Sequence, residues 1–330
     1  MKKSWKAAAA LAMIAVMLGA AGCGGDTKQS GKDKTYQVGV LQLVEHPALD
    51  AANKGFVDGL KSKGFEEGKN IMFDKQNAQG DQSNLQTIAQ RFVSNKVNLV
   101  CTIATPAAQT MANATKEIPI VGTAITDYKV AKLVKDNNQP GTNVTGTTDM
   151  NPVEAQIDLL VKIMPKAKTV GFIYNSSEVN SQLQIELAKK AAAARGLKTV
   201  EATVSSVNDI QQAAQSLVGK VDALYVPTDN VLASAMPNLI KITDEAKIPV
   251  FCGEAGMTKA GGVATLGIDY YKLGFQTGEM AADILSGKSK PQNMAIQSQK
   301  TFTVTLNEAQ IKKLGLTVPD DILKEAKGAK

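Results

Sequence analysis

The chain has 330 residues, 44% of them hydrophobic, and a formal net charge of +6. A chain of this length usually forms two domains of about 100–200 residues each. Setting aside Lys2, Lys3 and Lys6 near the amino terminus lowers the net charge to +3, and no basic stretch interleaved with aromatic side chains follows. These properties argue against a nucleic-acid-binding protein. The only histidine is His46. Serine triads and most zinc sites need at least one histidine and often several, so such sites are disfavoured.

The first 22 residues have the pattern of an export signal. Their lysines are followed by the uncharged run Ala7–Leu18, which is too short for a committed bilayer span, and then by small residues. Cys23 comes next, as in a lipoprotein signal whose cysteine is acylated and becomes the mature amino terminus. We therefore predict a signal peptide over 1–22, a lipidated flexible tether over 23–35, and an extracytoplasmic protein anchored by lipid to the outer face of the cell membrane. An ordinary secretory peptide cut near Ala21 is the alternative.

The first half of the remaining chain alternates strand-like and helix-like segments. Short β-prone runs are separated by longer stretches whose apolar residues recur every three or four positions, which predicts helices with one apolar face against a sheet. The predicted strands are Val38–Gln42, Ile71–Phe73, Val97–Ile103 and Ile118–Val121.

The second half repeats this order. Gly39 and Gly171, in the first strand of each half, are 132 residues apart, as are Gly64 and Gly196, which end the first helix of each half. Strands that alternate with helices predict parallel βαβ units with right-handed crossovers. The sequence therefore predicts an α/β protein with two doubly wound parallel-sheet lobes joined by a hinge. The predicted strands of the second half are Val170–Tyr174, Val200–Val204, Val221–Val226 and Ile248–Phe251.

The residues that follow each strand are the candidate ligand site, because ligands of open parallel sheets bind beyond the carboxyl ends of the strands. Helix starts favour a carboxylate and acidic side chains favour an ammonium, so the two together suit a zwitterion. A single polar residue after a strand is explained by helix capping alone. A whole set of such residues, facing one another across two lobes, predicts a ligand site. His46 is open to two interpretations, ligand contact or a hydrogen bond to loop backbone beside Pro47. The candidates are Glu45, His46, Gln79, Gly80, Thr105, Pro106, Thr126, Asp127, Ser176, Ser177, Glu178, Asn180, Thr228, Asp229, Asn230 and Glu254.

Familiar catalytic motifs are missing from the sequence. It has no Gly-x-Ser-x-Gly elbow, no glycine-rich phosphate loop ending in Lys-Ser or Lys-Thr, and no Cys-x-x-Cys pair. We therefore expect a protein that is not an enzyme and that uses no cofactor and no metal.

Several segments together carry a resemblance to a known family. They are Gln42–Asp50, Asn77–Asp81, Ala104–Gln109 and Asn143–Gly146 in the first half, and Tyr174–Asn180, Val226–Asn230 and Gly267–Tyr271 in the second. Over nearly all of the mature chain, the sequence resembles the extracytoplasmic solute-binding lipoproteins of ABC importers, specifically the tryptophan/tyrosine-binding branch. The resemblance implies a type I periplasmic-binding-protein fold. One departure is Tyr128, which stands where the family commonly has a proline and can alter the floor of the pocket.

The resemblance also implies a division of the chain. In this fold the chain crosses between the lobes about three times, which gives lobe one as 36–148 plus about 271–290. Lobe two is then 149–270 plus about 291–330.

The implied function is that of a monomeric substrate-binding component of an ABC importer. Its lobes would close over an amino acid, with an aromatic one (tryptophan, tyrosine or phenylalanine) favoured, and deliver it to a membrane permease powered by a separate ATPase. We expect the ligand ammonium at Asp229, helped by Glu254 or Asp127. The carboxylate would bind at Thr105, Ser176, Ser177 and helix-start N–H groups. Two alternatives remain: the same fold with another small solute (a branched-chain amino acid, nucleoside or short peptide), or an extracellular ligand sensor.

Overall fold

The computed structural model describes residues 35–328, which belong to one compact unit. The predicted signal peptide, Cys23 and all but the end of the predicted tether lie outside the described residues. Within the described residues, no helix is both long enough and apolar enough to cross a bilayer.

The first sheet is wholly parallel, with the strand order β11-β5-β4-β3-β1-β2. Its central strands are buried along their whole length, as expected for a parallel sheet covered on both faces. The strands are β1 (Tyr36–Gln42), β2 (Ile71–Asn77), β3 (Leu99–Ile103), β4 (Ile120–Ile125), β5 (Val144–Thr148) and β11 (Gln297–Ser298).

The second sheet has the order β12-β10-β9-β8-β6-β7, in which only β12 is antiparallel to its neighbour. Five strands of each sheet follow the same spatial order along the chain, so the predicted internal repeat and the two doubly wound lobes are confirmed. The strands are β6 (Thr169–Asn175), β7 (Lys198–Val204), β8 (Ala223–Val226), β9 (Val250–Cys252), β10 (Ala264–Gly267) and β12 (Thr303–Leu306).

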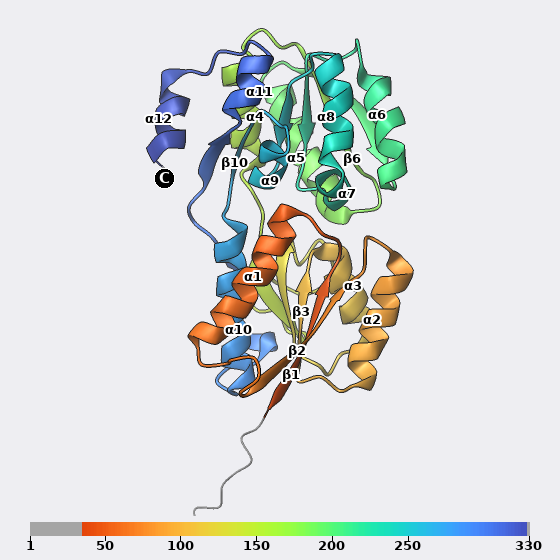
Figure 1. The fold of residues 1–330 in the computed structure, drawn as a ribbon, viewed down its shortest axis with the longest axis vertical. Helices are drawn as coiled ribbons and strands as arrows, with labels where there is room; N and C mark the ends of the chain where they lie inside the picture. The colour runs from red at the N-terminus through yellow and green to blue at the C-terminus, as the bar shows by residue number, and fades with distance from the viewer. Residues whose placement is uncertain (1–34, 329–330) are drawn as a thin grey trace, which may run out of the picture. The chain divides into compact units, whose positions relative to one another are not determined.

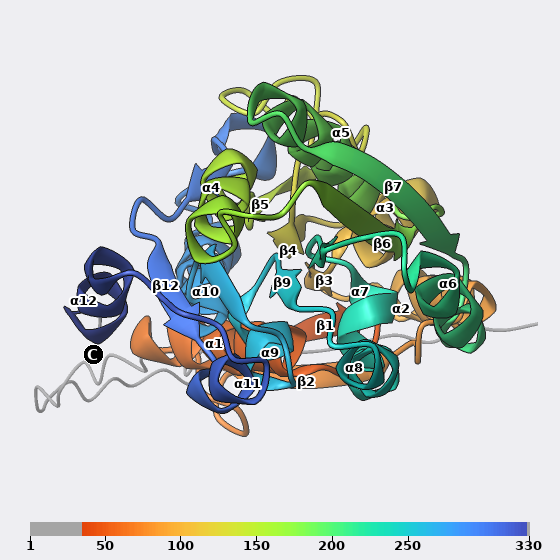
Figure 2. The same ribbon diagram turned by 90° about the horizontal axis from the view of Figure 1, so that it is seen from above.

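Helices cover both faces of each sheet. In the first lobe, α1 and α10 lie on one face and α2 and α3 on the other (Figure 1). In the second lobe, one core cluster joins the sheet to α4 and α5, and another joins it to α6 and α8. Figure 2 shows α12 beside β12. The helices of the first lobe are α1 (Pro47–Ser62), α2 (Gln82–Ser94), α3 (Thr105–Ala114) and α10 (Tyr270–Leu285). Those of the second are α4 (Val153–Ile163), α5 (Val179–Ala194), α6 (Ile210–Leu217), α7 (Asn230–Ser234), α8 (Met236–Glu245), α9 (Ala255–Lys259), α11 (Glu308–Lys313) and α12 (Asp320–Gly328), with a short 3-10 turn at Val207–Asp209. A second 3-10 turn, Pro291–Asn293, lies beside β5 of the first lobe.

Helices α1 and α10 pack backbone against backbone. A Cβ atom placed on Gly274 of α10 would lie 1.9 Å from the carbonyl oxygen of Ala52 in α1, and one placed on Gly55 would lie 2.1 Å from the carbonyl oxygen of Tyr271. Only glycine permits this approach. The glycine contact therefore fixes the two helices against each other and, with them, the loops at their amino-terminal ends.

The chain passes between the lobes three times within the described residues, at 149–152, 268–269 and 299–302. The last of these passages corrects a predicted boundary. The chain returns to the second sheet after Ser298, not near residue 291, because β11 pairs with β5 in the first sheet. The Thr145 hydroxyl donates to the carbonyl of Met294 (2.7 Å), which holds this segment at the sheet edge. The other lobe boundaries stay predictions.

Tyr128 lies in the core of the first lobe and not in the pocket floor. Its ring is fully buried, and its hydroxyl lies 2.7 Å from the carbonyl oxygen of Gly122 and 3.0 Å from that of Thr147. The hydroxyl therefore ties β4 to β5 inside the first sheet.

Candidate functional site

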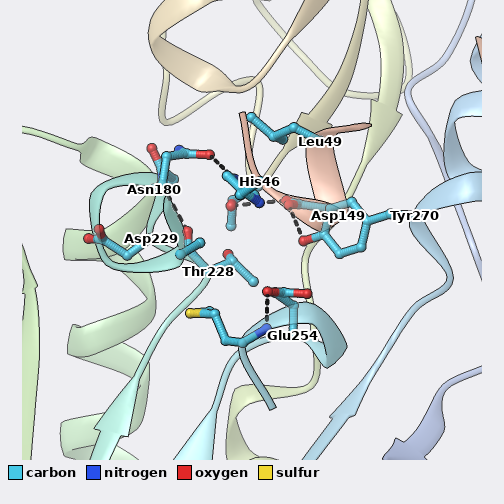
Figure 3. A pocket seen from close by; sticks show the side chains of 13 residues that line it. His46, Leu49, Asp149, Asn180, Thr228, Asp229, Glu254 and Tyr270 are labelled. Carbon is cyan, nitrogen blue, oxygen red and sulfur yellow. Dashed lines mark hydrogen bonds between the residues drawn. The ribbon is translucent and has the colours of Figure 1, made fainter. Parts of the chain in front are cut away.

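A pocket lies between the carboxyl-terminal ends of the strands of the two sheets (Figure 3). Asn180 and Asp229 stand on one side, Asp149 and Tyr270 on the other, and His46 between them. Both lobes therefore contribute to one site, as predicted from the rule for parallel sheets. The lining residues are His46, Leu49, Ala124, Thr126, Asp149, Asn180, Thr228, Asp229, Asn230, Ala233, Glu254, Met257 and Tyr270.

The pocket is tightly closed. It encloses about 300 Å³ counting space that opens to solvent, but only about 10 Å³ of this can take the centre of a water molecule. Small-molecule sites usually measure about 300–1,000 Å³. A ligand larger than a few atoms therefore enters only if the lobes or the lining side chains move apart.

Asp149 joins two elements of the first lobe at the pocket. It lies where the chain leaves β5, and its carboxylate accepts hydrogen bonds from the Thr126 hydroxyl (3.0 Å) and the Tyr270 hydroxyl (2.7 Å). Burial raises the pKa of Asp149 above its ordinary value, and the two hydroxyl groups oppose this rise. A carboxylate has about four lone-pair sites, so Asp149 retains acceptor capacity for a ligand.

Asp229 and Glu254 cap the short helices of the second lobe. Asp229 accepts from the backbone N–H groups of Asn175 (2.6 Å) and Leu232 (3.0 Å) and from the Ser181 hydroxyl (2.7 Å). Glu254 accepts from the backbone N–H groups of Gly256 and Met257. Burial raises the pKa of both carboxyl groups. Asp229 thus accepts more hydrogen bonds from the protein than Glu254 does.

The pocket is acidic. Asp149, Asp229 and Glu254 line it together, and neither lysine nor arginine is among its lining residues. Buried carboxylates without a cationic partner are costly. The site therefore favours a ligand that carries a positive charge.

His46 makes contact between the lobes. It precedes α1 as the N-cap residue, it is only 7% exposed, and its Nε2 lies 3.2 Å from the side-chain oxygen of Asn230 in the second lobe. Burial lowers the pKa of His46. Within the described residues its ring nitrogens make no hydrogen bond to loop backbone, and ligand contact by His46 stays a prediction.

The structure brings together seven of the sixteen residues predicted from the sequence: His46, Thr126, Asn180, Thr228, Asp229, Asn230 and Glu254. Glu178 is buried directly behind them and hydrogen-bonds to Asn180 and Asn230. Which of these residues touch a ligand stays a prediction.

The remaining predicted residues do not line this pocket. Gln79 and Gly80 follow the edge strand β2 and are exposed, as are Ser176 and Ser177 after β6. Asp127 instead accepts from the backbone N–H of Val130, which is ordinary turn capping. The others are Glu45, which is exposed, and Thr105 and Pro106 at the start of α3.

Sequence reasoning missed Asp149 and Tyr270, which lie at the passages between the lobes. Asp149 directly follows β5 and Tyr270 comes soon after β10, two strands that were not predicted, and both residues stand at lobe boundaries. That position was the available signal, because a segment that passes between lobes borders any space between them. The apolar lining residues Leu49, Ala124, Ala233 and Met257 were also missed; they carry no sequence signal that separates them from core residues.

Comparison with known proteins places this geometry in a family. The family model for ABC transporter substrate-binding proteins matches residues 37–330. A tyrosine-binding protein of Clostridioides difficile is 43% identical over 291 residues, which cover 88% of this chain and 84% of that protein.

Two solved structures are similar over most of this chain. One is an ABC domain from Streptococcus pneumoniae in complex with L-Trp, with 40% identity, a TM-score of 0.86, and coverage of 89% of this chain and 99% of that one. The other is the ligand-free, open structure of a substrate-binding protein with adhesive properties from Clostridium difficile, with 47% identity, a TM-score of 0.67, and coverage of 87% and 97%. The L-Trp complex has the higher TM-score, although the open protein is more similar in sequence.

The fold is that of type I periplasmic binding proteins, and solute-binding proteins of ABC transporters act outside the cytoplasm. Three observations support the same family assignment: the two sheets, the acidic pocket between them, and the family match over residues 37–330. This chain belongs to the family of ABC transporter substrate-binding proteins.

Proposed function

We propose that this protein binds an amino acid between its lobes, with tyrosine or tryptophan favoured, and delivers it to the permease of an ABC importer. The observation that carries the proposal is the pocket lined by Asp149, Asp229 and Glu254 with no lysine or arginine beside them. An α-ammonium group supplies the missing positive charge. The names of the two relatives, one tyrosine-binding and one crystallised with L-Trp, support the aromatic choice.

The pocket also offers an apolar surface for the ligand side chain. Leu49, Ala124, Ala233 and Met257 line it, and the ring of Tyr270 borders it. Burying a large apolar side chain contributes about 1.5–3 kcal/mol. An aromatic amino acid gains more from this surface than a small or polar one does.

Closure of the lobes is the proposed means of capture. A ligand that contacts Asp149 from one lobe and Asn180 or Glu254 from the other stabilises the closed arrangement, which the permease would recognise. The relative described as open and ligand-free is consistent with this cycle. We also propose that Cys23 carries lipid and that the segment before Tyr36 tethers the receptor to the outer face of the membrane, beside its permease. No catalytic step is proposed.

Isothermal titration calorimetry tests the proposal. L-tyrosine, L-tryptophan, L-phenylalanine, L-leucine and D-glucose are titrated into the full chain. We expect the aromatic amino acids to bind at micromolar concentrations or below and glucose not to bind. Asp149→Asn, which keeps the shape of the side chain and removes its charge, should weaken binding by about 10- to 100-fold. Tight binding of glucose or leucine in preference to all aromatic amino acids would refute the ligand assignment.

A further inference from the structure

Glu178 lies behind the pocket and orients several amide side chains. It is 4% exposed, and its carboxylate accepts from the side-chain NH₂ groups of Asn180 (2.9 Å), Asn230 (2.5 Å) and Asn175 (3.3 Å). An amide whose NH₂ group is held by a carboxylate must turn its oxygen the other way. Glu178 therefore determines where these amide oxygens point.

The amide oxygen of Asn230 in turn fixes the tautomer of His46. This oxygen can only accept, and it lies 3.2 Å from His46 Nε2, so Nε2 carries the hydrogen. Burial keeps the imidazole neutral. Nδ1 is then a lone-pair acceptor, and among the described residues it is buried without a hydrogen-bond partner.

Asn180 presents a second oriented acceptor. Its NH₂ group donates to Glu178 and to the carbonyl of Thr228 (3.2 Å), so the amide is held with its Oδ1 free. Within the part of the chain that the structure describes, this oxygen is also buried without a partner. Leaving such an acceptor unpaired costs about 1–3 kcal/mol. His46 from the first lobe and Asn180 from the second line the same pocket.

Given the proposed amino-acid ligand, we propose that Glu178 is a positioning residue which sets His46 Nδ1 and Asn180 Oδ1 as a pair of acceptors, one on each lobe, for the ligand's ammonium group. An ammonium has three N–H donors and can bond to both acceptors while it neutralises the surrounding carboxylates. The ammonium thus links the two lobes directly. This assignment differs from one at Asp229, whose oxygens already accept three protein donors.

The single histidine makes the proposal directly measurable, because ¹⁵N-labelled histidine gives the signals of one imidazole in a protein with only His46. In the ligand-free protein we expect the Nε2–H tautomer with an unprotonated Nδ1. Addition of L-tyrosine should move the Nδ1 resonance in the direction of hydrogen-bond acceptance. Addition of 3-(4-hydroxyphenyl)propionate, which lacks the amino group, should leave Nδ1 unmoved and should bind about 10- to 100-fold more weakly. A protonated Nδ1, or an equal shift with both compounds, would overturn the proposal.

Variants of Glu178 separate positioning from folding. Glu178→Met removes the acceptor, so we expect a mixture of tautomers and at least about a tenfold loss of affinity for L-tyrosine. Glu178→Gln keeps one acceptor oxygen for Asn180 and Asn230, so His46 should remain in the Nε2–H tautomer. Glu186→Met, an exposed change on α5, the helix that Glu178 precedes, is the control. A folded Glu178→Met protein with the wild-type tautomer and affinity refutes the role of Glu178. If Glu178→Met does not fold, the wild-type spectrum still decides the tautomer.

Two failures can be told apart. If no amino acid binds, the proposed function and the ammonium assignment both fall, while the tautomer still tests the role of Glu178. If L-tyrosine binds without moving Nδ1, the proposed function stands and the ammonium assignment fails.

Discussion

Gly274→Ala tests whether the contact between α1 and α10 positions the pocket. The new Cβ would lie 1.9 Å from the Ala52 carbonyl oxygen, and ordinary contact begins at 3.4 Å, so the helices must separate by the difference of 1.5 Å. Overpacking of this kind costs about 1–3 kcal/mol, and we expect the upper end here because the clash is with backbone atoms of α1; the helix propensity of alanine returns about 1 kcal/mol. We expect a net loss of about 2 kcal/mol in the free energy of unfolding. Because α1 carries Leu49 and α10 begins at Tyr270, we also expect weaker binding of L-tyrosine.

Urea denaturation measures the stability of this variant, and calorimetry measures its affinity. Gly64→Ala is the matched control: its φ of +88° strains alanine, but no atom lies within 4 Å of the new Cβ. The control should lose about 1 kcal/mol through strain alone and keep its affinity. If Gly274→Ala were as stable as the wild type, or less destabilised than Gly64→Ala, the close helix contact would be refuted.

Three further predictions concern buried polar groups. Tyr270→Phe removes the hydroxyl that donates to Asp149, so it should lower the free energy of unfolding by about 1 kcal/mol and weaken L-tyrosine binding, as denaturation and calorimetry would show. Tyr128→Phe should cost a similar amount in stability but leave affinity unchanged, because Tyr128 does not line the pocket. Burial raises the pKa of the pocket carboxyls, so the folded state binds more protons than the unfolded state above their ordinary pKa values. The ligand-free protein should therefore lose stability as the pH rises above these ordinary values, which are about 4. The lowered pKa of His46 opposes this trend only below its ordinary 6.5. Thermal unfolding across this range measures the slope, which Asp149→Asn should reduce, and stability that rises steadily with pH would contradict the assignment.

Much of the fold could be predicted because the sequence repeats its pattern. Paired glycines, periodic helices and short apolar strands identified both lobes, since a parallel sheet buried on two faces requires continuous apolar strands. Strands β5, β10 and β12 were not predicted, and the edge strand β11 was missed as well. It has two residues, both exposed, and it is held by a backbone carbonyl that no side-chain pattern reveals.

The candidate site could be predicted only in part, because strand order decides which strand ends meet. Asn180 and Asp229 lie near the middle of the second sheet's carboxyl edge, whereas Gln79 follows an edge strand and points to solvent. A list of polar residues after strands cannot make this distinction. Asp149 and Tyr270 were not found because they follow β5 and β10, two strands that the sequence pattern did not predict.

Small-angle X-ray scattering during a titration with L-tyrosine tests most directly whether this protein captures an amino acid by closing its lobes. We predict that the radius of gyration falls as L-tyrosine is added, with a midpoint that matches the calorimetric affinity, and that D-glucose leaves it unchanged. Asp149→Asn should shift the midpoint to higher concentration. Calorimetric binding of L-tyrosine with no change in the radius of gyration would contradict capture by closure, and no binding of any amino acid would contradict the proposed function itself.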